Sequence, residues 1–121
     1  NKVFDAVAQI LEHFGRIDIL VNDAGVNYRV PVLEFPEEEW DRIINTNLKG
    51  YFFTAQAVAP QMIANGYGKI INMSSILGTV GLPNQVAYAS SKGGVDQMTK
   101  VMALEWAKLG VRVNAVGPTY F

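Results

Sequence analysis

Three short apolar runs alternate with long helical patterns along this chain, and the alternation limits it to a small set of folds. The runs occupy residues 17–21, 69–73 and 111–116, and each has the pattern of a buried strand. Helical spacing of apolar residues precedes each run, over residues 3–14, 37–65 and 86–109. Strands that alternate with helices predict an α/β protein with a parallel sheet, in the order α-β-α-β-α-β.

The predicted crossovers leave one face of this sheet without cover. Right-handed connections in a constant direction place the helices at 37–65 and 86–109 on the same face. Strands this apolar normally have helices on both sides. The chain also opens at Asn1 within a helical pattern and ends at Phe121 directly after a strand. We therefore expect residues 1–121 to be part of a single larger domain, or to have their bare face covered by another chain.

The composition argues against several classes of partner. Ten basic and eleven acidic residues give a net charge of −1 without a Lys/Arg block, unlike the basic surface of a nucleic-acid-binding protein. No apolar stretch reaches the roughly 18 residues of a membrane helix. The chain has no cysteine and one histidine, His13, so no metal site is expected. We expect a cytoplasmic protein that binds a small neutral molecule.

Tyr88 and Lys92 form the first candidate for chemistry. They are four positions apart at the start of the helix at 86–109, so they share one helix face. A nearby ammonium favours the ionised form of a phenol and suits it to general acid/base catalysis. The alternative is an ordinary surface pair, since Tyr-x-x-x-Lys is common by chance.

Further polar and small residues follow the predicted strands, at the carboxyl edge where open α/β sheets bind ligands. Ser75 follows the second strand, where it either bonds a substrate carbonyl or forms a turn. The segments at 22–25 and 117–119 follow the other two strands and either approach a ligand or make plain turns. Asn47, within the second helix, is either a tolerated polar residue or an amide that bridges a water at a kink.

Five segments together resemble the classical short-chain dehydrogenases/reductases in order and spacing. They are Asn-Asp-Ala-Gly at 22–25, Asn-Thr-Asn-Leu-Lys-Gly at 45–50, Ile-Asn-Met-Ser-Ser at 71–75, Tyr-Ala-Ser-Ser-Lys at 88–92 and Val-Arg-Val-Asn-Ala at 111–115. Each motif is weak alone, but the combined spacing of Asn47, Ser75, Tyr88 and Lys92 matches the family's catalytic tetrad. The resemblance implies a partial Rossmann-like, doubly wound parallel sheet.

The resemblance also implies a role for each of these residues. Tyr88 would be the general acid/base, Ser75 would polarise the substrate oxygen, Lys92 would support Tyr88 and hold the nicotinamide ribose, and Asn47 would anchor a water of the proton relay. The cofactor, NAD or NADP, would exchange a hydride with a secondary alcohol or ketone of the sugar, polyol or ketoacyl type. The residues that would line its site are Asn22, Ala24, Gly25, Tyr88, Lys92, Pro118 and Thr119.

The chain departs from the family in three ways. Asp23 and Thr119 stand where the family usually has asparagine and glycine, and Asp23 would bring a carboxylate near the cofactor phosphates or adenosine. The glycine-rich phosphate turn that normally opens such a protein has no match, so the pyrophosphate and adenosine sites are absent from these residues. We therefore expect the isolated 121-residue chain to be inactive or nearly so.

Two further interpretations follow from the same residues. The helices at 37–65 and 86–109 resemble the pair through which the family forms homo-oligomers, so the chain is alternatively a non-catalytic folding or assembly fragment. An epimerase or dehydratase of the family's extended branch shares Tyr-x-x-x-Lys but fits the tetrad spacing less well.

Overall fold

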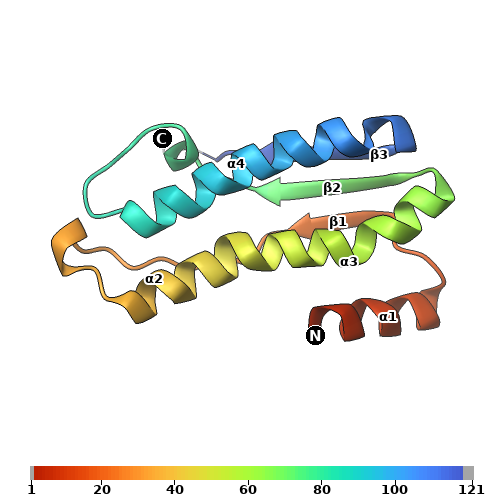
Figure 1. Ribbon diagram of the computed structural model, residues 1–121, viewed down its shortest axis with the longest axis horizontal. Helices are drawn as coiled ribbons and strands as arrows, with labels where there is room; N and C mark the ends of the chain where they lie inside the picture. The colour runs from red at the N-terminus through yellow and green to blue at the C-terminus, as the bar shows by residue number, and fades with distance from the viewer. Residues whose placement is uncertain (1, 119–121) are drawn as a thin grey trace.

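The computed structural model describes residues 2–118 and confirms the predicted α-β-α-β-α-β order (Figure 1). Thr119, one of the residues expected near the cofactor, lies outside this range. The helices are α1 (Lys2–Phe14), α2 (Glu37–Ile44), α3 (Gly50–Asn65) and α4 (Val86–Trp106), with a π-helical turn at Asn45–Lys49 that joins α2 to α3. The strands are β1 (Ile19–Asn22), β2 (Gly68–Met73) and β3 (Val111–Val116). Short 3-10 turns lie at Val32–Glu34, Ile76–Gly78 and Ala107–Leu109.

The three strands form one parallel sheet in the order β1-β2-β3. Both α3 and α4 pack on the same face of this sheet, as the crossover rule predicted, and α1 packs against α3 (Figure 1). The buried apolar side chains between the layers are Val7, Ala55, Val58, Met62, Ile70, Met102, Val111 and Val113. Because the strands are parallel, all three end at the same edge, where the segments carrying Ala24, Ser75 and Gly117 begin.

The other face of the sheet is bare within residues 2–118. Ile19 and Val21 are 57% and 52% exposed, although a strand with these residues is normally buried. The register pairs Ile19 with Lys69 and Val21 with Ile71 on β2, so these four side chains lie on the same face of the sheet. The residues between them point to the opposite face, which packs against the helices. The predicted lack of cover is confirmed for the part of the chain that is described.

The first strand begins later than the sequence predicted, at Ile19 and not at Ile17. A side chain takes the place of a neighbouring strand at Ile17: the Gln61 amide accepts from the Ile17 N–H at 3.2 Å and donates to its carbonyl at 2.6 Å. Both backbone groups are therefore satisfied without a ladder bond. The sequence held no local sign of this contact, because Gln61 lies on α3, far along the chain.

The predicted helix at 37–65 is continuous but not uniformly α-helical. Over Asn45–Lys49 it widens into a π-helical turn, an uncommon feature that often occurs at functional sites. Asn47 lies in this turn and is fully buried. Local helix widening therefore accompanies the burial of a polar residue that the sequence analysis singled out. None of the helices in residues 2–118 combines the length and apolarity needed to cross a membrane.

Candidate active site

Lys92 is buried at the centre of the candidate site. Its side chain extends from α4, is only 3% exposed, and donates from Nζ to the Met73 carbonyl at the end of β2, at 2.7 Å. Nζ also lies 5.7 Å from the centre of the Tyr88 ring, as the shared helix face predicted. No group within residues 2–118 forms a hydrogen bond with the half-buried Tyr88 hydroxyl, which is thus available to a ligand.

Burial lowers the pKa of Lys92 below its ordinary value, while the negative charges of Asp23 and Asp96 raise it. The carboxylate of Asp23 therefore acts on the ammonium of Lys92. The resemblance had placed this carboxylate near the cofactor phosphates or adenosine, so its effect on the lysine is a finding of the structure.

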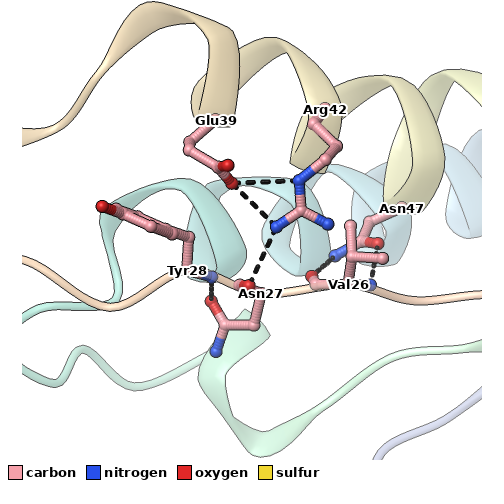
Figure 2. A network of polar contacts seen from close by, with 6 residues as sticks. All are labelled: Val26, Asn27, Tyr28, Glu39, Arg42 and Asn47. Atoms are coloured by element: carbon pink, nitrogen blue, oxygen red, sulfur yellow. Dashed lines mark hydrogen bonds and ion pairs between the residues drawn. The ribbon is translucent and has the colours of Figure 1, made fainter.

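Asn47 fastens the loop after β1 to the helical layer (Figure 2). Its Oδ1 accepts from the Val26 N–H and its Nδ2 donates to the Val26 carbonyl, both at 2.9 Å. Nδ2 also donates to Ser91 Oγ at 3.3 Å, and Ser91 Oγ donates to the Tyr88 carbonyl at 2.7 Å. Asn47 thus connects the loop to the first turn of α4, and both of its amide hydrogens are already used within the protein.

The same loop has a second attachment, through Arg42 of α2. The guanidinium pairs with Glu39 at 2.7 Å and donates to the Asn27 carbonyl at 3.1 Å (Figure 2). The Asn27 side chain in turn donates to Gln85 Oε1 at 2.9 Å, directly before α4. The loop is therefore tied at successive residues to α2, to the π-helical turn and to the start of α4, which holds it in place before a ligand arrives.

Ser75 lies at the carboxyl end of β2, as predicted. Its Oγ accepts from the Leu77 N–H at 3.2 Å and so caps the 3-10 turn at Ile76–Gly78. A serine hydroxyl that accepts in this way still has its own hydrogen to donate. Ser75 thus stabilises a turn, which is one of its two predicted roles. Its hydroxyl hydrogen remains available to bond a substrate oxygen.

The residues expected to line the cofactor site differ in their surroundings. Asn22 is buried, and its Nδ2 donates to Asn72 Oδ1 at 2.9 Å and to the Tyr51 carbonyl at 3.3 Å, so its amide secures β1 within the fold. Ala24 and Gly25 are exposed at the carboxyl edge of the sheet. The Pro118 carbonyl accepts from the Ile76 N–H at 3.3 Å, which brings the end of β3 beside the segment that follows Ser75.

Tyr51 is a site residue that the sequence analysis missed. It lies in the first turn of α3, and its hydroxyl is 3.4 Å from Lys92 Nζ and 2.7 Å from the Ala24 carbonyl. It follows Asn47 at a spacing of one helical turn, which was the available signal. An aromatic residue at that spacing is more commonly a core residue, so the pattern alone did not reveal the contact with Lys92.

The family model of the short chain dehydrogenases matches residues 1–121. The chain belongs to this family. Among curated relatives, it is 44% identical over 120 residues to a 3-oxoacyl-acyl-carrier-protein reductase of Thermotoga maritima, and 42% identical over 121 residues to the gluconate 5-dehydrogenase of Gluconobacter oxydans. These matches cover 99% and 100% of this chain but 49% and 47% of the relatives, so the chain spans about half their length.

Solved structures of the family have the same fold. A gluconate 5-dehydrogenase from Burkholderia cenocepacia in complex with NADP and tartrate has a TM-score of 0.95 at 42% identity. An NAD+-bound xylitol dehydrogenase has a TM-score of 0.94 at 39% identity. Each alignment covers 98% of this chain and 47% or 46% of the solved chain. The described residues therefore form a partial Rossmann-like fold of this family.

Proposed function

We propose that this chain is the catalytic part of an oxidoreductase that transfers a hydride between NAD or NADP and a secondary alcohol or ketone. The observation that carries the proposal is the buried Lys92 ammonium beside the ring of Tyr88, at the carboxyl edge of a parallel sheet. An ammonium in that position favours a phenol that exchanges its proton during catalysis. A mere surface pair would leave the lysine in water.

The residues present fit a nicotinamide cofactor and a carbonyl substrate. The Tyr88 hydroxyl and the Ser75 hydrogen have no acceptor among residues 2–118, and a carbonyl oxygen accepts from both such groups. Lys92 would hold the ribose hydroxyls, and the exposed backbone of Ala24 and Gly25 allows close approach. Pro118 and Thr119 follow β3 and would complete the nicotinamide side of the site.

In the direction of reduction, Ser75 orients and polarises the ketone oxygen, and Tyr88 Oη donates its proton to that oxygen as the alcohol forms. The cofactor supplies the hydride to the carbonyl carbon when it is bound. Lys92 stabilises the negative charge left on the Tyr88 oxygen, and Asn47 holds the loop beside the site. Because both amide hydrogens of Asn47 are already used, Asn47 would anchor the water that returns the proton by accepting from it. In oxidation the same groups act in reverse.

The substrate class is a sugar, a polyol or a ketoacyl thioester. The relatives support this range, since they include a 3-oxoacyl-acyl-carrier-protein reductase, a gluconate 5-dehydrogenase and an NAD-dependent glycerol dehydrogenase. A 3-oxoacyl group contains a ketone, and carbon 5 of gluconate carries a secondary alcohol, which fits the proposed reaction.

We also propose a homo-oligomer formed through α3 and α4. A hollow of about 410 Å³ runs along the outer side of these helices, lined by Phe52, Gln56, Met98, Val101, Met102, Glu105 and Trp106. It lies toward the carboxyl end of α4, away from Tyr88 and Lys92, so we assign it to an interface rather than to substrate binding. The exposed apolar side chains of Val101 and Leu104 on the same helix support this assignment.

The function is tested by comparing the protein at its full natural length with the isolated 121-residue chain. The full-length protein is expected to quench its tryptophan fluorescence saturably with NADH or NADPH, and to reduce a ketone of the classes above. The isolated chain is expected to show no turnover, because the phosphate turn and one covering layer are absent from it. A full-length protein without saturable cofactor binding would support a folding or assembly module, and turnover by the isolated chain would refute the assignment of the missing half.

A further inference from the structure

The ammonium of Lys92 lies between two phenols, and only one of them is the proposed acid/base. Nζ is 5.0 Å from the ring centre of Tyr51 and 5.7 Å from that of Tyr88. It donates to the Tyr51 hydroxyl at 3.4 Å, and that hydroxyl donates to the Ala24 carbonyl at 2.7 Å. A continuous chain of hydrogen bonds therefore joins Lys92, through Tyr51, to the exposed turn after β1.

Tyr51 is suited to hold a proton rather than to transfer one. Its side chain is 2% exposed, and burial, followed by the charge of Asp23 and the neighbouring Tyr88, raises the pKa of Tyr51 to about 12. The phenol thus stays neutral at any working pH, and its single hydrogen points to the Ala24 carbonyl. The lone pairs of the Tyr51 oxygen are left for Lys92, so Lys92 is the donor in this hydrogen bond and Tyr51 is the acceptor.

The position of the Lys92 ammonium depends on this contact. Among residues 2–118, the other acceptor for Nζ is the Met73 carbonyl, at 2.7 Å, at the end of β2. The charges acting on the ammonium are those of Asp23, on the turn after β1, and Asp96, one helical turn further along α4. Without the Tyr51 hydroxyl, the Met73 carbonyl would be the remaining hydrogen-bond acceptor for Nζ among residues 2–118, and the Ala24 carbonyl would lose its donor.

We propose that Tyr51 is a positioning residue that holds Lys92 at the level of Tyr88 and couples the lysine to the Ala24–Gly25 turn. The inference rests on the proposed hydride-transfer function. Tyr51 is buried and acts through Lys92, and it lies on α3 directly after the π-helical turn. Lys92 of α4 is thus held in position by a residue of the neighbouring helix α3.

The test is Tyr51→Phe in the full-length protein, which removes the hydroxyl and keeps the ring. We expect kcat for ketone reduction to fall about tenfold, from the loss of one hydrogen bond to a charged group, and KM for the ketone to stay within about twofold. Tyr67→Phe is the matched control, because Tyr67 is 44% exposed in the turn between α3 and β2, at the opposite end of the sheet. This control is expected to behave as the wild type.

A second readout distinguishes positioning from simple structural support. The ¹³Cε signal of Lys92, assigned by its loss in Lys92→Arg, reports the titration of the ammonium. Because the Tyr51 oxygen accepts from the charged form, Tyr51→Phe is expected to lower the pKa of Lys92 further below its ordinary value. An isosteric 3-fluorotyrosine at position 51, whose oxygen is a weaker acceptor, is expected to move the titration in the same direction even where Tyr51→Phe folds poorly.

The outcomes separate this inference from the proposed function. An unchanged Lys92 titration in both Tyr51 variants overturns the inference, whatever happens to kcat, because the loss would then come from altered packing. An unchanged kcat in a folded Tyr51→Phe protein overturns it as well. A wild-type protein that reduces no ketone with NADH or NADPH contradicts the proposed function, while the Lys92 titration still tests the contact itself.

Discussion

Tyr88→Phe is expected to lower kcat for ketone reduction about a thousandfold in the full-length protein, within the range for losing a general acid. The variant keeps the ring beside Lys92 and removes only the hydroxyl, which has no partner among residues 2–118. Its effect on stability should therefore be small. Steady-state rates of NAD(P)H oxidation with a saturating ketone measure the loss.

Cofactor affinity separates this effect from general damage to the site. The dissociation constant of NADH or NADPH should stay within about twofold of the wild type, because the variant keeps the Tyr88 ring that would line the cofactor site and removes only the hydroxyl that acts on the reacting oxygen. Tyr67→Phe serves again as the control for removing a phenol oxygen. A Tyr88→Phe enzyme that kept a tenth or more of its kcat would show that another group supplies the proton.

Lys92→Met is expected to lower kcat about a hundredfold and to weaken cofactor binding, without loss of stability. The activity falls because the charge that supports Tyr88 and the group that would hold the ribose are both removed. Stability follows from the lowered pKa of Lys92: burial disfavours the charged form, so the ammonium costs free energy of folding at neutral pH. Methionine fills similar volume without that cost.

The direction of this effect on stability can be checked by varying the pH. The pKa of Lys92 is lower in the folded protein than in the unfolded chain. Between these two pKa values the unfolded wild-type chain binds more protons than the folded protein. The free energy of unfolding of the wild type therefore rises as the pH rises toward the unfolded pKa of 10.5. The urea midpoint of Lys92→Met should equal or exceed that of the wild type at pH 7, and the difference should shrink at higher pH. Lys100→Met, at an exposed position of the same helix, is the control. Full activity in Lys92→Met would remove the lysine from the mechanism.

The sequence was sufficient for the features that depend on periodicity and chain direction. Apolar spacing located α1, α3, α4 and all three strands, and the handedness of crossovers placed both long helices on one face of the sheet. The shared helix face of Tyr88 and Lys92 followed from their spacing alone. These are local or topological rules, and they hold without knowledge of side-chain packing.

The features that the sequence could not predict all depend on contacts between distant segments. The π-helical turn around Asn47, the Gln61 amide that replaces a strand partner at Ile17, and the contact of Tyr51 with Lys92 each join residues from different elements. Asn22 shows the same limit, since its motif did not reveal the bonds that its amide makes to Asn72 and to the Tyr51 carbonyl. Side-chain amides and hydroxyls have many partners that satisfy them equally well, so only the packed structure selects one.

The measurement that tests hydride transfer most directly is isotope tracing with NADH or NADPH that carries deuterium at both C4 positions. The full-length protein is expected to form an alcohol with one deuterium on the carbon that was the ketone carbonyl, with one equivalent of cofactor oxidised. Deuterium that stays in the cofactor, passes to water, or accompanies a product at the same oxidation level as the substrate would contradict the account. The last of these results would indicate an epimerase or dehydratase in its place.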